Sequence, residues 1–228
     1  GRGQFPDAAA IVDFTGDGRP DLLTFGPAQK PMVFLGKPDG NFAESPIVSL
    51  SDVGRTQLSD PSAVAVGDVD GDGDLDAFVP QYLNPYAGGR APTPYYDALD
   101  GLPAYLLIND GTGQFTDGTA QAGLAPKRLR RTYSTSLVDL DGDHDLDLVV
   151  VSDFSGLDLY LNDGKGKFKD ITDTLGAAHY SFGMSHAFAD FNADGNMDMY
   201  MVGMGSTTAR RLEHLGLGRK GFESVQAA

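Results

Sequence analysis

The sequence contains no cysteine and no tryptophan, and only 3 of its 32 acidic residues are glutamate. Without cysteine, the chain has neither disulfides nor thiolate metal sites. An acidic surface built on helices would be rich in glutamate, because aspartate is the poorer helix former. No apolar run reaches the length of about 20 residues that spans a bilayer. These absences argue against a disulfide scaffold, a helical fold and a membrane-spanning protein.

Basic residues are also scarce, with 17 Lys and Arg against 32 acidic residues and a net charge of −15. This charge disfavours a nucleic-acid partner, whose phosphates would be repelled. The chain of 228 residues, 41% of them hydrophobic, is long enough to bury a core as one domain. It begins GRGQFPDAAA, without Met or a signal-peptide pattern, which we interpret as a processed or excised piece.

A nine-residue acidic pattern occurs four times, at intervals of 55, 71 and 51 residues. Short apolar or small-residue runs lie on both sides of each copy, and a glycine-rich turn ending in Phe follows further on. The four copies are Asp13–Asp21 (DFTGDGRPD), Asp68–Asp76 (DVDGDGDLD), Asp139–Asp147 (DLDGDHDLD) and Asp190–Asp198 (DFNADGNMD). A disordered segment would not keep four registered copies of apolar runs with turns between them, so the repeats indicate folded units.

Each unit is typical of a strand, an acidic loop, two strands, a glycine-rich hairpin and a last strand. This order predicts an all-β fold, a β-propeller of four-stranded blades with four blades visible. The predicted blades cover residues 8–48, 62–120, 133–175 and 184–226, and the second carries an insert at 80–101. An open arc would leave sheet edges uncovered. We therefore expect a segment of a larger ring of about seven blades, in preference to a closed four-bladed ring; a partner chain that completes the ring is a further alternative.

Side-chain oxygens occupy positions 1, 3, 5 and 9 of every acidic loop, whereas position 7 varies, as expected if it contributes only its backbone carbonyl. Hard oxygen ligands in a flexible loop favour Ca²⁺, and Mg²⁺ fits less well because it prefers fewer protein ligands. The predicted metal-binding positions are Asp13, Thr15, Asp17, Arg19 and Asp21; Asp68, Asp70, Asp72, Asp74 and Asp76; Asp139, Asp141, Asp143, Asp145 and Asp147; and Asp190, Asn192, Asp194, Asn196 and Asp198. Ordinary turns use one or two aspartates, not five.

The spacing is similar to that of an EF-hand, but two features exclude that motif. An EF-hand needs a bidentate Glu at position 12 and flanking helices. The residues at position 12 are Thr24, Val79, Val150 and Met201, and the flanks are short and β-like. About four Ca²⁺ ions, one per loop, would bring the net charge from −15 to −7.

These units resemble FG-GAP/VCBS repeats, the blades of integrin α-type propellers, over roughly residues 8–226. The stretch NDGTGQFTDGTAQAGL (109–124) is more narrowly similar to secreted cartilage acidic protein-type members. The resemblance implies one Ca²⁺ per acidic loop and an extracellular or periplasmic location. His144 departs from the pattern at position 6, where glycine allows a sharp turn, so we expect some strain there. Thr15 and Asn192 each remove one charge, which predicts weaker binding in the first and fourth loops.

The chain contains no G-x-S-x-G, Walker or HExxH motif, and we expect no enzyme activity. His186, which precedes the fourth loop, is interpreted as a packed strand residue rather than half of an acid/base pair. The predicted function is a non-catalytic, calcium-binding extracellular module for adhesion, recognition or scaffolding, with a protein or glycan partner. The alternative is a lectin-like propeller or a non-catalytic part of a polysaccharide-processing enzyme.

Two further segments bear on partners. The insert contains Tyr82, Tyr86, Tyr95 and Tyr96 among Pro and Gly, and is either a contact surface or a loop packed on its own blade. The basic run KRLRR (127–131) lies between two predicted blades. We interpret it as a solvated linker that pairs with nearby aspartates, in preference to a site for a polyanion.

Overall fold

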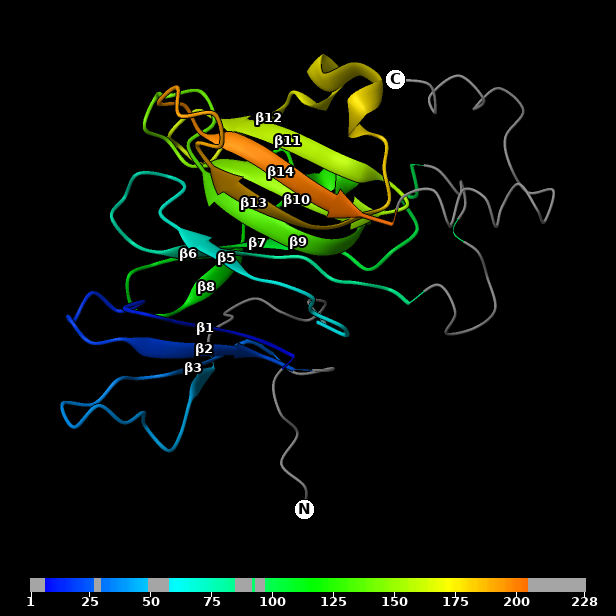
Figure 1. The fold of residues 1–228 in the computed structure, drawn as a ribbon. Coiled ribbons are helices and arrows are strands. Elements are labelled where there is room, and N and C mark those ends of the chain that lie inside the picture. Colours follow the sequence, from blue (N-terminus) through cyan, green and yellow to red (C-terminus); the bar gives the residue numbers. More distant parts are fainter. Residues whose placement is uncertain (1–6, 27–29, 49–57, 85–91, 93–96, 205–228) are drawn as a thin grey trace.

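The computed structural model describes residues 7–26, 30–48, 58–84, 92 and 97–204, which form four antiparallel sheets with two short 3₁₀ helices (Figure 1). Three sheets have four strands each, and the fourth has two in the described part of the chain. Within each sheet the strands pair in the order in which they follow along the sequence. The predicted all-β fold is therefore confirmed.

The sheets repeat one plan, with an acidic loop between the first and second strands and a glycine-rich turn between the third and fourth. The strands are β1 (Ala8–Val12), β2 (Asp21–Phe25), β3 (Met32–Phe34) and β4 (Ile47–Val48); β5 (Ala65–Gly67), β6 (Asp76–Val79), β7 (Tyr105–Asn109) and β8 (Phe115–Asp117); β9 (Arg131–Val138), β10 (Asp147–Asp153), β11 (Gly156–Asn162) and β12 (Phe168–Asp170); and β13 (Gly183–Ala189) and β14 (Asp198–Gly203). The 3₁₀ helices are η1 (Ala125–Lys127) and η2 (Thr172–His179). The fourth glycine-rich turn, EHLGLGRKGF (213–222), lies outside the described residues.

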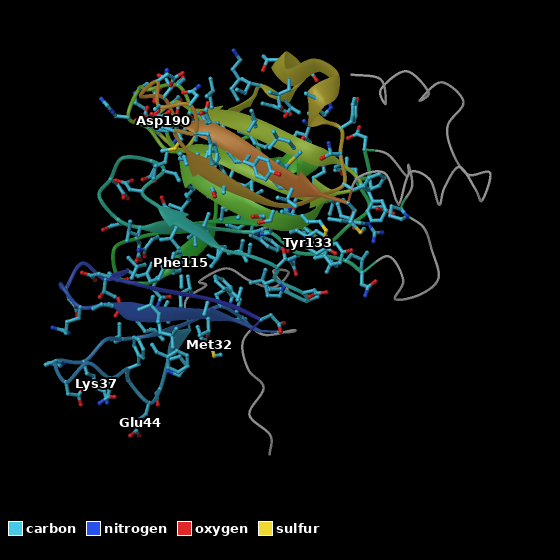
Figure 2. The ribbon with its side chains drawn as sticks, viewed as in Figure 1. Met32, Lys37, Glu44, Phe115, Tyr133 and Asp190 are labelled. Atoms are coloured by element: carbon cyan, nitrogen blue, oxygen red, sulfur yellow. The ribbon has the colours of Figure 1, made fainter. Side chains whose placement is uncertain are left out.

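Strand pairing closes each acidic loop in the same way. The residue before position 1 pairs with the aspartate at position 9 in all four units, as Val12↔Asp21, Gly67↔Asp76, Val138↔Asp147 and Ala189↔Asp198. All four loops lie at one end of the sheets (Figure 1). Asp190 marks this end and Tyr133, near the start of β9, lies toward the other (Figure 2). The fold therefore gathers the acidic loops and keeps them apart from the region of Tyr133.

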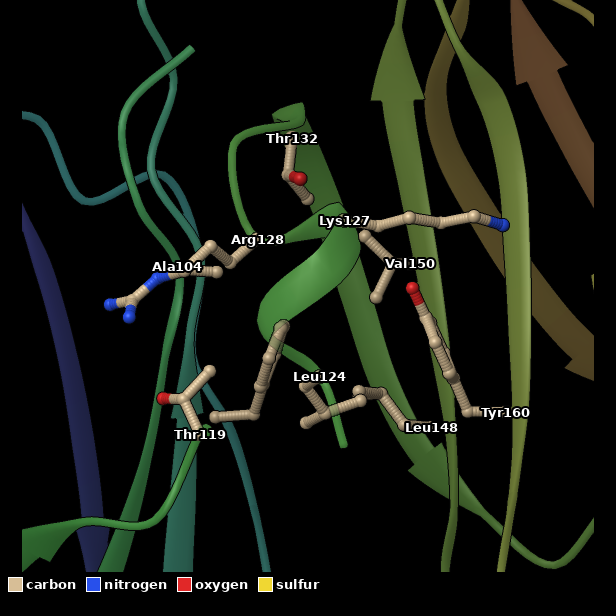
Figure 3. A pocket seen from close by; sticks show the side chains of 10 residues that line it. Ala104, Thr119, Leu124, Lys127, Arg128, Thr132, Leu148, Val150 and Tyr160 are labelled. Atoms are coloured by element: carbon tan, nitrogen blue, oxygen red, sulfur yellow. The ribbon is translucent and has the colours of Figure 1, made fainter. Parts of the chain in front are cut away.

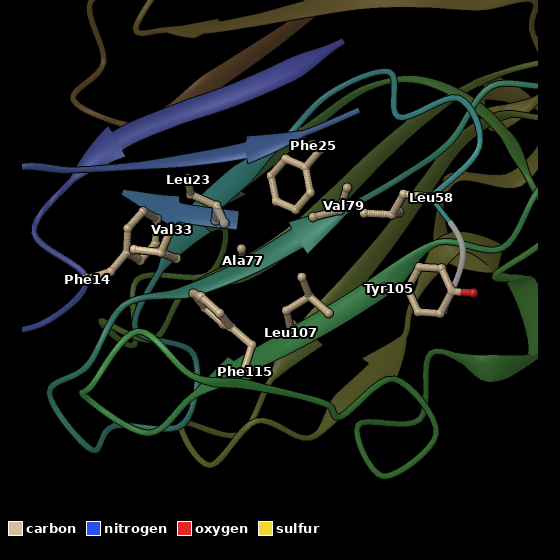
Figure 4. Packing of buried hydrophobic residues seen from close by; sticks show 10 residues of the cluster. All are labelled: Phe14, Leu23, Phe25, Val33, Leu58, Ala77, Val79, Tyr105, Leu107 and Phe115. Atoms are coloured by element: carbon tan, nitrogen blue, oxygen red, sulfur yellow. The ribbon is translucent and has the colours of Figure 1, made fainter. Parts of the chain in front are cut away.

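Neighbouring sheets pack face to face, because alternate residues of each second strand point to opposite sides. Between the first and second sheets, Phe14, Phe25 and Phe115 are buried with aliphatic residues of β2, β6 and β7 (Figure 4). The rings of Phe14 and Phe115 meet edge to face, with centroids 5.7 Å apart. Two further clusters fill the spaces between the second and third sheets and between the third and fourth. Each interior sheet is thus apolar on both faces.

The last described sheet has an uncovered outer face. Val149 and Val151 of β10 are fully buried beneath the fourth sheet. Tyr200 and Val202 hold the same positions on β14, counted from the aspartate that begins each strand, yet they are 62% and 49% exposed. At the other end, Ile11 of β1 is 65% exposed. The described sheets therefore form a row with two open ends rather than a closed ring.

The basic run between the second and third sheets is not a solvated linker. Arg130 and Arg131 are buried, whereas the sequence predicted a solvent-exposed segment. Its predicted pairing with aspartates is confirmed: Arg130 Nε lies 3.0 Å from Asp158 Oδ2 and Lys127 Nζ 2.8 Å from Asp158 Oδ1. Arg131 Nε lies 2.9 Å from Asp100 Oδ1. The run ties the second unit to the third through buried ion pairs.

A small cavity lies between the second and third sheets, beside η1 (Figure 3). Its lining is largely apolar and includes Leu124, Leu148, Val150 and Tyr160. The space holds about one water molecule. It is therefore too small for a sugar or a comparable substrate.

Candidate metal-binding loops

The aspartate at position 1 organises each acidic loop by accepting backbone hydrogen bonds. In every loop its Oδ2 accepts the N–H of position 6, and its Oδ1 accepts one or more N–H groups of positions 3 to 5. The position 6 donors are Gly18 (2.7 Å), Gly73 (3.0 Å), His144 (3.1 Å) and Gly195 (2.8 Å). Hydrogen bonds from Gly142 and His144 lower the pKa of Asp139. The aspartate at position 1 thus holds each loop curled around its side chain.

The curl requires positive φ at two positions of every loop. Position 4 has φ between 62° and 84°, and position 6 has φ between 76° and 94°. Six of these eight positions are glycine, which adopts such angles without strain. The exceptions are His144 (φ 76°) and Ala193 (φ 62°). The predicted left-handed conformation of His144 is confirmed, whereas the equivalent conflict at Ala193 was missed, although the alanine stands where three loops have glycine.

We expect His144→Gly and Ala193→Gly each to stabilise the protein by about 0.5–1 kcal/mol. A left-handed residue with a Cβ costs about 1–2 kcal/mol, part of which is offset by the greater freedom of glycine in the unfolded chain. Urea unfolding in saturating calcium measures the gain. As a control, Gly73→Ala (φ 94°) has open space for its Cβ, so only backbone strain should destabilise it. A loss of stability in both glycine variants would contradict the assignment of strain.

The aspartate at position 9 is the buried anchor of each loop. Asp21, Asp76 and Asp147 are fully buried. In all four loops Oδ2 of position 9 accepts the N–H of position 2, at 2.8–3.0 Å. In the first three units Oδ1 accepts an N–H from the end of the third strand, at 2.8–2.9 Å. Position 9 therefore joins its loop to the body of the sheet.

Two loops bring three carboxylates together. In each group, one oxygen from every residue lies within 4.8 Å of the others, the groups being Asp68, Asp70 and Asp76, and Asp139, Asp141 and Asp147. Calcium binds oxygens at 2.3–2.6 Å, so oxygens on opposite sides of one ion lie about 4.6–5.2 Å apart. Both groups therefore fit a single calcium ion.

The electrostatics of these groups are unfavourable without a cation. Burial, opposed by two backbone N–H groups and reinforced by the charges of Asp70 and Asp72, raises the pKa of Asp76 to about 7. Burial together with the charges of Asp141 and Asp143 likewise raises the pKa of Asp147. A bound cation would remove this repulsion and hold all three carboxylates ionised.

We expect the stability gained from calcium to be larger at pH 8 than at pH 6. Without metal, the raised pKa of Asp76 stabilises the folded state. This contribution is fully present below pH 3.8 and is lost as the pH rises through about 7. Calcium needs the ionised carboxylate, so its binding releases protons at pH 6 and few at pH 8.

Urea unfolding of metal-free and calcium-loaded protein at both pH values measures this difference. Burial lowers the pKa of His186, which therefore destabilises the fold below about pH 6.5. His186 lies outside the loops, so we expect its effect to cancel between the two forms. Calcium stabilisation that is equal at pH 6 and pH 8 would contradict the prediction.

Positions 5 and 7 are joined to each other within every loop. In all four loops Oδ1 of position 5 accepts the N–H of position 7, at 2.8–2.9 Å. The carboxylates of Asp74 and Asp145 at position 7 lie against Gly111 and Gly164 of the glycine-rich turns, where a Cβ would come within 2.5 Å of them. Positions 5 and 7 are thus not part of the three-carboxylate groups.

The first and fourth loops differ from the other two. Among the residues that the structure describes, neither brings three carboxylates together. Thr15 Oγ1 donates a hydrogen bond to Asp21 Oδ2 (3.0 Å), and the guanidinium of Arg19 pairs with Asp17. In the fourth loop Asn192 Nδ2 donates to Asp194 Oδ2 (3.0 Å). The residue at position 3 thus donates to the position 9 carboxylate in the first loop and to the position 5 carboxylate in the fourth.

The remaining residues singled out from the sequence lie away from the loops. His186 contacts two hydroxyls of β9, Ser134 Oγ at 3.0 Å and Ser136 Oγ at 2.7 Å. Tyr82 stacks on Tyr133, with ring centroids 4.1 Å apart, and its hydroxyl donates to Asp153 (3.1 Å). Tyr86, Tyr95, Tyr96 and His214 lie outside the described residues.

The fold and the loops define a class of all-β repeat protein in which an acidic loop joins the first two strands of each unit. The model of the FG-GAP-like repeat matches residues 13–79 and 139–201, more than half of the chain, and the chain belongs to this family. The crystal structure of the V. cholerae biofilm matrix protein Bap1 is similar over 85% of the chain, with 14% identity and a TM-score of 0.40.

This chain spans 23% of the length of the Bap1 chain. No curated protein matched the sequence. The narrower resemblance to cartilage acidic protein-type members finds no support in these comparisons. In the described part of the chain, every helix is too short or too polar to cross a membrane.

Proposed function

We propose that this chain is a calcium-binding module of an extracellular or periplasmic β-propeller that serves adhesion, recognition or scaffolding and carries no catalytic activity. The observation that supports it is the pair of three-carboxylate groups in the second and third loops. Burial, together with the charges of neighbouring aspartates, raises the pKa of the position 9 aspartate in each group, and a divalent cation would favour its ionised form. All the ligands are hard oxygens, as calcium prefers. Loops of this kind suit the millimolar calcium found outside cells.

In this proposal positions 1, 3, 5 and 9 hold the ion by side-chain oxygens, and position 7 offers its backbone carbonyl. The second and third loops bind most tightly. The first and fourth bind more weakly, because Thr15 and Asn192 carry no charge and their loops use internal donors. Calcium supplies positive charge at each site, and the chain supplies loops whose position 1 and position 9 carboxylates are already held in place.

Calcium titration by calorimetry and native mass spectrometry tests the assignment. The wild-type chain should bind at least two ions, and Asp70→Asn and Asp141→Asn should each abolish one tight site. Asparagine occupies the same position in the fourth loop, so the fold tolerates it there. Asp110→Asn is the control, since Asp110 lies in a glycine-rich turn outside the acidic loops. Unchanged calcium binding in both loop variants would refute the proposal.

The partner of this module is proposed to include more repeat units. Ile11 at one end and Tyr200 and Val202 at the other are exposed on faces that neighbouring sheets cover elsewhere. Further repeats or a partner chain that completes the ring would cover them. Residues 1–228 expressed alone should therefore self-associate at micromolar concentration, and Tyr200→Lys should reduce that association in analytical ultracentrifugation. A monomer that binds no hydrophobic dye would argue against open faces.

A second candidate function, glycan binding, is supported by one observation. Tyr133 lies in the region away from the acidic loops (Figure 2), and Tyr82, which belongs to the insert, stacks on it. Aromatic platforms are common contact surfaces. Tyr133→Ala, compared with the wild type on a glycan array and in pull-downs of extracellular proteins, separates the two classes. Loss of a glycan would favour a lectin, and loss of only a protein partner would favour scaffolding.

A further inference from the structure

Two buried asparagines connect the acidic loops of neighbouring units. Asn109 ends β7 and Asn162 ends β11, and they are 3% and 6% exposed. Asn109 Nδ2 donates to the carbonyl of Phe14 in the first loop (2.8 Å) and to that of Leu75 in the second (3.2 Å). Each amide therefore bridges the loop of its own unit and the loop of the preceding unit.

Asn162 repeats the arrangement one unit later. Its Nδ2 donates to the carbonyl of Val69 in the second loop (2.8 Å) and to that of Leu146 in the third (3.1 Å). The orientation of the amide is settled by chemistry, because both partners are carbonyls and only the NH₂ side can donate to them. The Oδ1 atoms accept backbone N–H groups of the adjoining turns, from Gly113 (3.2 Å) for Asn109 and Asp163 (2.9 Å) for Asn162. Both amides are fully satisfied and fixed.

The same bonds reach the buried aspartates of the loops. The N–H of Asn162 donates to Asp147 Oδ1 (2.8 Å) in the third loop. On the other side of the bridge, Val69 accepts the amide of Asn162 at its carbonyl, and its N–H, which belongs to the preceding peptide group, donates to Asp76 Oδ2 (3.0 Å). Three hydrogen bonds, joined through the covalent structure of Val69 and Asn162, thus connect Asp76 with Asp147, the position 9 residues of the two three-carboxylate groups.

A matching path joins the first and second loops. The N–H of Asn109 donates to Asp76 Oδ1 (2.9 Å), and the N–H of Phe14, whose carbonyl Asn109 binds, donates to Asp21 Oδ2 (3.0 Å). In the first unit Gly36 stands where the other two units have asparagine. It donates its N–H to Asp21 in the same way but has no side-chain amide. The sequence has Gly216 at the corresponding point of the fourth unit, so the asparagine occurs in the second and third units.

We propose that Asn162 makes calcium binding in the second and third loops cooperative, and that Asn109 does the same between the first and second. The inference rests on the proposed calcium function. An ion in the second loop orders the backbone at Val69 by fixing Asp76, which accepts the N–H of that residue. The carbonyl of Val69 then holds the side chain of Asn162, whose own N–H holds Asp147 in place for the next ion. The third loop is then already ordered when the second ion binds, so this binding loses less conformational entropy. The two sites are therefore positively coupled.

Coupling is measured as the effect of one site on the affinity of the other. Calcium binding at the third loop can be followed by NMR through the backbone amide of His144, which lies within that loop. Asp70→Asn gives the second loop the position 3 residue of the fourth, so it stays empty at the calcium concentrations that fill the third loop. In the wild-type background it should weaken calcium binding at the third loop by about 5-fold or more, the lower range of known coupling.

The two asparagines are matched controls for each other. In an Asn162→Ala background, Asp70→Asn should change the affinity of the third loop by less than about 2-fold. In an Asn109→Ala background the full weakening should remain, although both alanine variants remove an equally buried amide. A purely structural role would lower the stability of both variants alike and leave the coupling factor unchanged. Asn162→Gly, which gives this point the residue that the first unit has there (Gly36), also removes the amide and replaces Asn162→Ala if that variant does not fold.

Each outcome decides between the proposals. If Asp70→Asn leaves the third loop unaffected in the wild type, or weakens it equally in Asn162→Ala, the coupling is refuted while calcium binding stands. Equal weakening in both backgrounds would mean that charge acts through space and not through Asn162. If neither loop binds calcium, the proposed function fails and the coupling fails with it.

Discussion

In excess chelator the protein should melt about 10–20 °C below its melting temperature in millimolar calcium. A ligand present at about 100 times its Kd stabilises a fold by about 2.7 kcal/mol per site, so the two tight loops contribute about 5 kcal/mol. For a domain of this size, 1 kcal/mol shifts the melting temperature by about 2–4 °C. The effect is large because the metal-free loops keep three carboxylates within 4.8 Å.

The double variant Asp70→Asn/Asp141→Asn provides the control for this experiment. It removes one carboxylate from each three-carboxylate group, so its melting temperature should rise in chelator and respond little to calcium. Magnesium in place of calcium should stabilise the wild type less, since Mg²⁺ keeps its waters and takes fewer protein ligands. Equal melting temperatures of the wild type in chelator and in calcium would contradict the assignment.

The structure shows why the loops were predictable from the sequence. All the groups that shape one loop lie within nine residues of each other, and the pattern repeats four times. Position 1 binds N–H groups a few residues away, and position 9 begins the next strand, so spacing alone indicates the arrangement. His144 was identified in this way because glycine fills the same position in the other three loops.

Contacts between units were not predictable in the same way. The bridge from Asn162 to Val69 joins residues 93 positions apart. The sequence carried a signal for it, since LLIN and LYLN place asparagine at the same point of two repeats, but nothing in one unit indicates what that amide contacts. The burial of Arg130 was missed for a similar reason. A basic run between two strands is typical of a solvated linker. Here the second and third sheets pack around it, and it forms ion pairs with Asp158 in the interior.

Replacing Asp158 by Asn should destabilise the protein by about 3–5 kcal/mol. The Asp158 side chain is 1% exposed and receives the guanidinium of Arg130 at 3.0 Å and the ammonium of Lys127 at 2.8 Å. Without the Asp158 carboxylate, the buried guanidinium of Arg130 keeps only Asp97, whose side chain is half exposed, and breaking a buried ion pair typically costs this much. Urea unfolding in saturating calcium measures the loss apart from any effect on the acidic loops.

Asp97→Asn is the matched control, because Asp97 pairs with the same guanidinium from a side chain that is 51% exposed. Exposed ion pairs contribute about 0–1 kcal/mol, and asparagine tolerates the positive φ of 63° at this position. A similar loss in both variants would mean that the total charge around Arg130 matters and the burial of its partner does not. A loss confined to Asp158→Asn would show that the second and third units are held together by a pair that neither sheet could keep buried alone.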